Sequence, residues 1–260
     1  MNLYDKMRAE FARHNPTNDM LKDVYGLDSA EDYHAIIVAP SWRPEAVFGN
    51  YNPVIIPKRE KAYYHGYEVI VSEKKFGYML TGRSSGMMLD SCLLLGSAKC
   101  SNVIFAGYVG ALVENIRVGD IVTPKHSIAG DGASLYLHEN ISTGNYRNIV
   151  NQKEASLHRL KETASTLKID IREKTHYCTD SIFCEYYHLD DILALGSETI
   201  DCETSVFIKC MELINKDYFV LHCVSDNSAC GNALIGSEKD RERVHLSREN
   251  RIPEIIFALS

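Results

Sequence analysis

The chain consists of short apolar runs that alternate with longer segments of helical periodicity. Ala35 to Ala39 is brief, rich in β-branched residues and followed by Pro40, a pattern typical of a buried strand. Similar runs at 103–106 and 218–224 alternate with segments such as 203–214, whose apolar residues recur at helical spacing. Alternation of this kind favours a parallel sheet with helices on both faces. We therefore predict a three-layer α/β/α fold with a mixed, largely parallel central sheet.

The remaining segments extend the same pattern. Strands are predicted at 54–56, 78–81 and 118–123, a Gly-centred hairpin at 63–71, a turn at 107–111, a strand-like stretch at 175–184, and helices at 87–95, 151–167, 190–195 and from Glu238 onward. Ser84 or Ser85 is expected to cap the helix at 87–95, and Ser237 to cap the last helix. Pro253 is expected to break or kink that last helix.

Composition excludes several classes of protein. With 45% hydrophobic and 24% charged residues, the chain is typical of a globular protein, and one domain is expected over 1–260, with 1–33 as a polar N-terminal extension. The formal net charge of -7 argues against a nucleic-acid binder. No signal-like stretch and no run of about 18 apolar residues occurs, so a cytoplasmic protein without a membrane partner is expected. The eight cysteines form no CxxC pair and are expected to be reduced.

Polar residues follow several of the apolar runs where the predicted strands end. These clusters are Ser41-Trp42-Arg43, Gly82-Arg83-Ser84-Ser85, Asp201-Cys202-Glu203-Thr204 and Ser225-Asp226-Asn227. In open α/β sheets, ligands gather at the carboxyl ends of the strands. We therefore expect the functional site to be built from these clusters.

Several segments resemble motifs of a known family. Gly107-Tyr108-Val109-Gly110-Ala111, Val118-Gly119-Asp120-Ile121-Val122, Asp131-Gly132-Ala133-Ser134-Leu135, Ile200-Asp201-Cys202-Glu203-Thr204 and Val224-Ser225-Asp226 are similar in order and spacing to segments of the hexameric uridine and purine nucleoside phosphorylases. The resemblance extends over about residues 35–235. It implies an enzyme that cleaves the N-glycosidic bond of a nucleoside with phosphate, releasing the free base and ribose 1-phosphate.

Two acidic residues are suited to this reaction. The bond breaks through an oxocarbenium-like sugar, so the ribose hydroxyls must be held and the departing base stabilised. Glu203 can accept hydrogen bonds from two hydroxyls, the alternative being an N-cap or first-turn acid of the helix at 203–214. Asp226 can act as the general acid, the alternative being an Asx turn that ends the strand. With the resemblance, ribose binding by Glu203 and acid catalysis by Asp226 are favoured.

Other substrate-binding residues follow from the resemblance alone. Asp201 and Cys202 stand where the family has Glu and Met in its ribose-binding segment, so both are expected at the floor of the pocket. Phe183 or Ile182 is expected to stack on the base, the alternative being packing in the core.

The resemblance is incomplete in the phosphate site. Arg43 takes the place of an arginine in the family's first loop, and Arg59 is expected to be lent by a neighbouring subunit. Phe105 stands where phosphorylases carry a further phosphate arginine, and Tyr108 replaces Ser or Thr. Arg83, before a predicted helix N-terminus, either restores the missing charge or is an exposed loop residue. Two alternatives to phosphorolysis therefore stay open: hydrolysis by a nucleosidase, and nucleoside binding without catalysis.

The family also implies partners. A nucleoside and inorganic phosphate are the expected ligands, with no cofactor, and Cys178, Cys184 and His188 fit no usual zinc spacing. Dimers assembled into a hexamer are the implied oligomer. The Val-Ser-Asp at 224–226 resembles purine-directed members and the Asp-Gly-Ala-Ser at 131–134 uridine-directed ones, with purine favoured.

Overall fold

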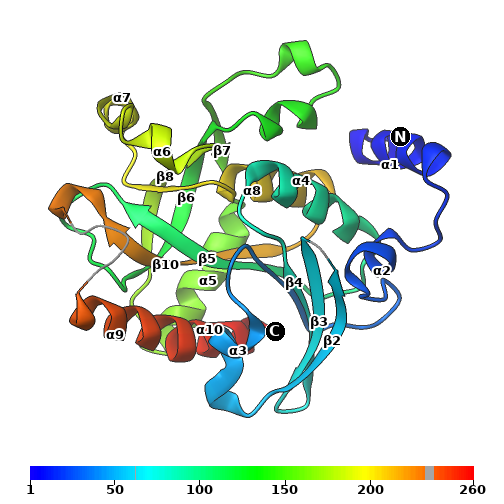
Figure 1. The fold of residues 1–260 in the computed structure, drawn as a ribbon, viewed down its shortest axis with the longest axis horizontal. Helices are drawn as coiled ribbons and strands as arrows, with labels where there is room; N and C mark the ends of the chain where they lie inside the picture. Colours follow the sequence, from blue (N-terminus) through cyan, green and yellow to red (C-terminus); the bar gives the residue numbers. More distant parts are fainter. Residues whose placement is uncertain (62, 232–236) are drawn as a thin grey trace.

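The computed structural model describes residues 1–61, 63–231 and 237–260, and these contain a 10-stranded sheet flanked by helices (Figure 1). The strands are β1 (Ala35–Ala39), β2 (Val54–Lys61), β3 (Tyr64–Val71), β4 (Lys74–Leu80), β5 (Val103–Ala111), β6 (Ile121–Gly130), β7 (Asn148–Asn151), β8 (Arg172–Thr179), β9 (Thr199–Asp201) and β10 (Tyr218–Asn227). The helices are α1 (Leu3–His14), α2 (Met20–Tyr25), α3 (Pro44–Phe48), α4 (Ser85–Leu93), α5 (Glu154–Thr166), α6 (Ile182–Glu185), α7 (Leu189–Ala194), α8 (Thr204–Leu213), α9 (Glu238–Leu246) and α10 (Ile252–Leu259).

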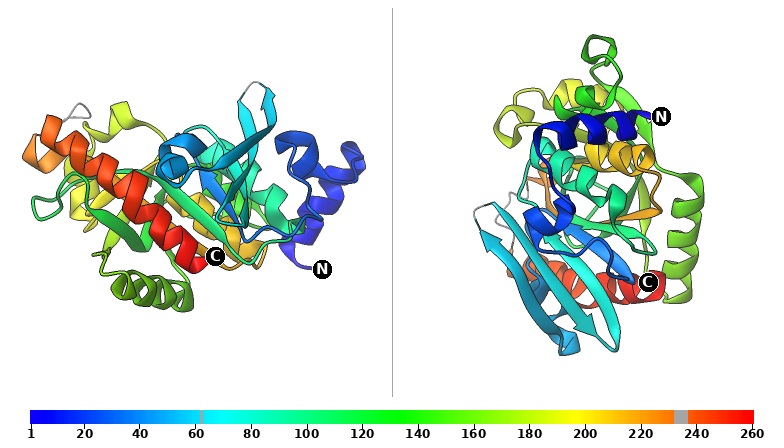
Figure 2. Two further views of the ribbon diagram at one scale, coloured as in Figure 1. Left: turned by 90° about the horizontal axis from the view of Figure 1, so that it is seen from below. Right: turned by 90° about the vertical axis from the view of Figure 1, so that its right-hand side faces the viewer.

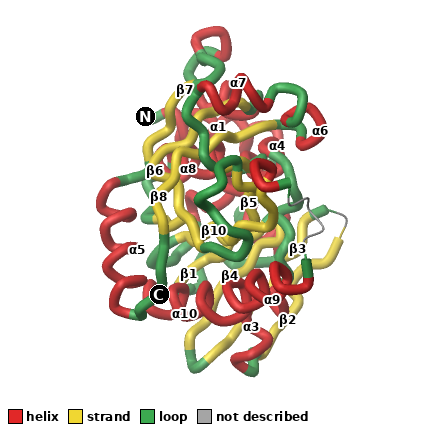
Figure 3. The backbone as a smooth tube through the Cα atoms, turned by 90° about the vertical axis from the view of Figure 1, so that its left-hand side faces the viewer, coloured by secondary structure: helices red, strands yellow, loops and turns green. Residues whose placement is uncertain are grey.

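Side chains of the central strands alternate between two cores. In β1, Ile36 and Val38 belong to one core, whereas Ala35, Ile37 and Ala39 belong to the other. β5 and β10 follow the same period of two. Residues of α4 and α8 complete the first core, while those of α5 and α10, which pack side by side (Figure 3), complete the second. The predicted three-layer α/β architecture is therefore confirmed.

The sheet is mixed, and its order determines which strand ends meet. The order is β10-β6-β8-β9-β5-β1-β4-β3-β2, β7 pairs with β6, and a further pairing of β10 with β5 closes part of the sheet on itself. β5 runs parallel to β10 and antiparallel to β9. Gly110 of β5 consequently pairs with Ile200 on one side and with Asp226 on the other. Two of the predicted polar clusters, distant in sequence, thus lie on either side of one glycine.

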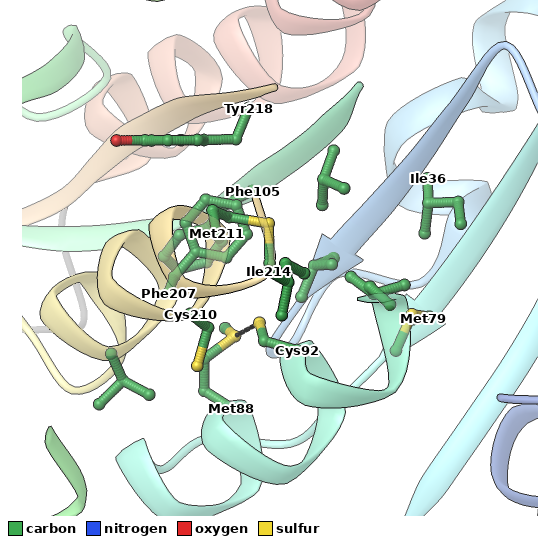
Figure 4. Packing of buried hydrophobic residues seen from close by; sticks show 14 of the residues in the cluster. Ile36, Met79, Met88, Cys92, Phe105, Phe207, Cys210, Met211, Ile214 and Tyr218 are labelled. Carbon is green, nitrogen blue, oxygen red and sulfur yellow. Dashed lines mark hydrogen bonds between the residues drawn. The ribbon is translucent and has the colours of Figure 1, made fainter. Parts of the chain in front are cut away.

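The first core shows why α4 and α8 have their sequences (Figure 4). Phe105 of β5 packs against Phe207 of α8, with ring centroids 5.1 Å apart. Met88 and Cys92, one turn apart on α4, lie close to the apolar face of α8, and their sulfur atoms are 3.4 Å apart. The residues needed for this contact recur at helical spacing, which is why both helices were predictable from sequence.

Two glycine-containing segments differ from prediction. Residues 63–71 do not form a hairpin, because Gly66 lies within the single strand β3. A Cβ atom on Gly66 would lie 1.8 Å from the carbonyl oxygen of Tyr25, so this glycine permits β3 to pass directly against α2. Residues 107–111 are not a turn but the second half of β5. Gly107 and Gly110 therefore lie within a strand, and the chain does not reverse there.

Helix boundaries follow the predicted capping residues. The Ser84 hydroxyl accepts from the Met87 amide (3.1 Å) at the start of α4, and Ser237 accepts from Asp240 (3.2 Å) at the start of α9. The strand-like stretch at 175–184 is only partly a strand, because β8 ends at Thr179 and α6 begins at Ile182.

The last helix continues through its proline. α9 passes through a π-helical turn (Ser247–Arg251) directly into α10, so the three form one rod (Figure 2). Pro253 stands in the first turn of α10, where its missing N–H is tolerated. Pro253 has no N–H to donate to the carbonyl oxygen of Glu249, four residues earlier. The side-chain amide of Asn50 lies 3.5 Å from that oxygen instead. The predicted break is therefore a π turn.

The polar N-terminal extension forms α1 and α2 and packs against the first core through Tyr4, Leu21 and Tyr25. The eight cysteines are free thiols. In the part of the chain that the structure describes, no helix is both long and apolar enough to cross a bilayer.

Candidate active site

A cavity of about 460 Å³ lies at the carboxyl ends of the central strands. Its lining contains a member of each predicted cluster, namely Ser41, Arg83, Glu203 and Asp226. Four carboxyl-bearing residues form what we call the strand-end wall: Glu185, Asp201, Glu203 and Asp226. α9 and the π turn contribute what we call the helix wall: Asp240, Arg241, Val244, His245 and Arg248. Most of the acidic residues thus come from the strand ends and α6, and most of the basic residues from the last helix.

Glu203 lies where β9 gives way to α8. Its side chain is buried, with 5% of the residue exposed, and its Oε1 has no hydrogen-bond partner among the described residues. Burial, and next the charge of Asp201, raises the pKa of Glu203 well above its ordinary value, which Arg83 partly opposes. A buried acceptor without a donor costs about 1–3 kcal/mol. Hydroxyl donors from a ligand would recover this free energy.

Asp201, rather than Glu203, caps α8. Its Oδ1 accepts from the backbone amides of Glu203 and Thr204, each at 3.1 Å, and from His176 Nε2 at 2.7 Å. Its Oδ2 accepts from the Thr204 hydroxyl. Burial opposes ionisation, but the adjacent His176 holds the pKa of Asp201 well below its usual range. Asp201 lines the cavity as predicted, but both of its oxygens are bonded within the chain, so it positions Glu203. Its neighbour Cys202 lines the cavity.

Asp226 reaches the cavity through an irregularity near the end of β10. The register of β10 on β5 shifts between Val224 and Asp226, which places a β-bulge at Ser225. Asp226 is 5% exposed and accepts from the Ser225 hydroxyl at 2.6 Å. Burial raises the pKa of Asp226, and the Ser225 hydrogen bond opposes that rise. A carboxyl group of this kind retains a proton closer to neutral pH, as a general acid requires.

Glu185 is a carboxyl group that the sequence analysis did not single out. It is 7% exposed, ends α6 and lines the cavity. Burial, with a further contribution from the charge of Asp226, raises the pKa of Glu185 to about 7. At neutral pH this group can therefore accept or donate a proton.

Arg248 is the second residue that the sequence analysis missed. Its Nη1 donates to the Tyr108 hydroxyl at 2.9 Å, and its Nη2 bonds Glu249. Tyr108, predicted in the phosphate site, therefore lies in the cavity beside an arginine from the helix wall.

Two predicted phosphate arginines lie elsewhere. Arg43 does not line the cavity, because it donates to the Tyr67 hydroxyl at 3.2 Å and lies 3.9 Å from the Glu60 carboxylate. Arg59 is exposed on β2, outside the cavity of its own chain, so a role for it depends on a neighbouring subunit. Arg83 does line the cavity.

Two predicted aromatic positions are also corrected. Phe183 is 90% exposed and does not line the cavity, whereas Ile182 and Tyr186 do. Ile182, Glu185 and Tyr186 share one face of a helical turn at spacings of three and four, and Phe183 falls outside that face. Phe105 is fully buried in the first core, so alternation along β5 keeps it out of the cavity.

Little in the sequence indicates the two missed residues. The face containing Glu185 appears only if 182–186 is helical, whereas the pattern at 175–184 predicts a strand-like stretch. Arg248 lies beyond the segment of α9, where the sequence shows only a proline five residues later. Its position depends on how the π turn docks.

Residues 47–252 match the model of the phosphorylase superfamily. No curated protein matches the chain.

Solved structures share the fold at low sequence identity. The 5'-methylthioadenosine/S-adenosyl homocysteine nucleosidase of Campylobacter jejuni has a TM-score of 0.66 and 15% identity, covering 87% of this chain and 98% of its own. The AMP nucleosidase of Bacteroides thetaiotaomicron has 0.67 and 16%, covering 91% and 94%. The purine nucleoside phosphorylase of Toxoplasma gondii has 0.70 and 14%, covering 90% and 92%. Identities this low establish the fold alone.

Proposed function

Because the chain belongs to the phosphorylase superfamily, we propose that it cleaves the N-glycosidic bond of a purine nucleoside, with phosphate as the nucleophile. One observation carries the proposal: Glu203 and Asp226, from distant parts of the chain, line the same cavity. Superfamily membership supports an enzyme that acts on nucleosides, and the choice of base and nucleophile rests on the residues of the cavity.

The proposed reaction breaks the bond between C1′ of the sugar and a ring nitrogen of the base. The base leaves with the bonding electron pair and takes a proton from Asp226, while a phosphate oxygen bonds to C1′. The raised pKa of Asp226 favours its protonated form, so the proton is available when the bond breaks. A purine suits this acid because its ring offers a basic nitrogen outside the glycosidic bond.

Glu203 is proposed to hold the sugar. Its unpartnered Oε1 provides an acceptor for a ribose hydroxyl, and hydroxyl donors would favour the ionised carboxylate. A carboxylate near the sugar also stabilises the positive charge that develops at the oxocarbenium-like transition state. Asp201 and His176 hold the start of α8, so the Glu203 side chain leaves a fixed backbone.

Hydrolysis is the second candidate, and Glu185 is the observation that favours it. With a pKa raised to about 7, Glu185 can take a proton from water at neutral pH, while the water oxygen bonds to C1′. The position of Arg43 outside the cavity also leaves one fewer cation for a phosphate nucleophile.

A role for Arg59 in phosphate binding requires that copies of the chain assemble. It lies on β2, which with β3 extends beyond the rest of the sheet (Figure 2). We propose that the chain forms a homo-oligomer in which this strand pair brings Arg59 to a neighbouring cavity. Light scattering tests this, since a monomer contradicts a role for Arg59.

One assay decides between the two reactions. Purine nucleosides are incubated with and without phosphate, and free base, ribose and ribose 1-phosphate are separated by chromatography. Base release that requires phosphate and yields ribose 1-phosphate supports phosphorolysis. Equal release without phosphate, with free ribose, supports hydrolysis. Nucleoside binding without base release contradicts both and supports a non-catalytic member of the fold.

A further inference from the structure

Arg248 has an unsatisfied donor in the helix wall. It is the second residue of the π turn, and its guanidinium contacts the Tyr108 hydroxyl, Glu249 and, at 2.9 Å, Nδ1 of His245. Its Nε–H is buried without a hydrogen-bond acceptor in residues 1–61, 63–231 and 237–260. A buried charged donor of this kind carries a free-energy cost.

The backbone that carries Arg248 is anchored. The Ser247 hydroxyl donates to the carbonyl oxygen of Gly119 at 2.6 Å, and the Tyr51 hydroxyl donates to that of Asn250 at 3.0 Å. Both bonds join the π turn to segments far away in sequence. The position of the guanidinium is therefore set by the docking of the turn as well as by its own side-chain contacts.

Tyr108 adds a second donor at the same place. Its hydroxyl accepts from Arg248 Nη1, so its own proton can be given to a ligand. Burial raises the pKa of Tyr108, which keeps the phenol protonated at neutral pH. The Arg248 guanidinium and the Tyr108 hydroxyl thus lie side by side in the cavity lining.

The charges near this pair are of both signs, and Asp240 of the helix wall contributes a carboxylate. Glu249 offsets one positive charge and also bonds His245 at 2.7 Å. Arg83 and Arg241 bring two further positive charges to the same cavity. The carboxyl groups of the strand-end wall come from other elements, β9, β10 and α6.

We propose that Arg248 and Tyr108 form a subsite for a phosphate group. A phosphate offers several acceptor oxygens in a tetrahedral arrangement, and a guanidinium N–H next to a hydroxyl can engage two of them. The phosphate is either the free co-substrate or a phosphate monoester carried by a nucleotide substrate. The subsite rests on the proposed function, since it supplies from the helix wall the cation that Phe105 does not supply from β5.

Binding measurements test the subsite without requiring turnover. Isothermal titration calorimetry measures Kd for inorganic phosphate, for adenosine and for adenosine 5′-monophosphate, with the wild-type protein, Arg248→Gln and Tyr108→Phe. Arg251→Gln is the matched control, because it removes an exposed arginine of the same π turn that does not line the cavity. Thermal unfolding of each variant shows whether it is folded.

The expected result is a weakening of phosphate-group binding by at least tenfold in Arg248→Gln and severalfold in Tyr108→Phe, with Arg251→Gln unchanged. If only the binding of inorganic phosphate is weakened in Arg248→Gln, the subsite holds the co-substrate. If Arg248→Gln binds adenosine 5′-monophosphate no more tightly than adenosine, the subsite holds the phosphate of a nucleotide. Equal phosphate binding by wild type and both variants overturns the subsite, as does wild-type protein that binds neither anion. Phosphate binding through Arg248 without release of base would overturn the proposed function and leave the subsite standing.

Discussion

The two walls of the cavity are built in different ways. Side chains of the strand-end wall are held by main-chain geometry: Asp226 follows a bulge in β10, and Asp201 bonds two amides at the start of α8. In the helix wall, which lies on a single helical rod, His245 and Arg248 are held by Glu249, and Arg248 also by Tyr108 of β5. Asp201, Glu203 and Asp226 therefore sit at the sheet edge, whereas the basic residues of the helix wall depend on the docking of the helical rod.

This difference separates two kinds of function. Proton transfer and the holding of a sugar need atoms placed to within a fraction of an ångström, which strand ends provide. Attraction of an anion tolerates looser geometry, because charge acts over a longer distance. Substitutions in the strand-end wall are thus expected to affect catalysis more than substitutions in the helix wall.

Asp226→Asn is expected to have the largest effect, lowering kcat for release of a purine base by about 1000-fold, because the amide cannot supply the proton. Steady-state release of base, followed by chromatography, measures it. Asp240→Asn is the matched control, since Asp240 lines the cavity from the helix wall and is bonded to Ser237 and Arg243. A rate for Asp226→Asn within a few-fold of wild type would remove Asp226 from the acid role.

Asp201→Asn is expected to lower the free energy of unfolding by about 3 kcal/mol, because it leaves His176 without its carboxylate and weakens the cap of α8. Folding lowers the pKa of Asp201, so this stability is present above the ordinary carboxyl pKa and is lost as the pH falls. Urea unfolding at several pH values measures both. Glu249→Gln, a change in the π turn beside the helix wall, should cost under about 1 kcal/mol; a similar cost for both variants would contradict the contrast between the walls.

Glu203→Gln is expected to lower kcat/KM by about 100-fold, because a neutral amide stabilises the developing positive charge of the sugar less well. The side chain keeps its size, so unfolding temperature should change little. Kinetics with a nucleoside and with its sugar analogue lacking the 2′-hydroxyl form the test. If the wild-type enzyme discriminates between them no better than Glu203→Gln does, Glu203 does not hold that hydroxyl.

Glu185→Gln is expected to have the smallest effect, seen in the pH dependence of stability. Burial raises the pKa of Glu185 to about 7, so the folded protein keeps a proton that the unfolded chain loses above pH 4.5. Stability from this group therefore falls as the pH rises from about 4.5 to about 7. Thermal unfolding across this range should show a shallower decline in Glu185→Gln than in wild type. Parallel curves would place Glu185 at an ordinary pKa.

Local pattern accounts for most of the fold and for the acids at the strand ends. β1, β5 and β10 were predictable because buried strands are short and β-branched, and Ser84 and Ser237 identified two helix starts. Glu203 and Asp226 could be proposed because each stands at the end of an apolar run, where ligands gather in α/β sheets. That they meet depends on β9 running antiparallel to β5, which no local pattern indicates.

Sequence by itself thus determined the alternation of strands and helices and which acids follow the strands, since both depend on residues close together in the chain. Only the tertiary structure decided that Phe105 belongs to the core, that Phe183 faces solvent, and that Glu185 and Arg248 enter the cavity. These outcomes depend on the phase of a helical turn and on the docking of a π turn against distant segments. Such contacts are decided by packing across the whole chain, and no local pattern encodes them.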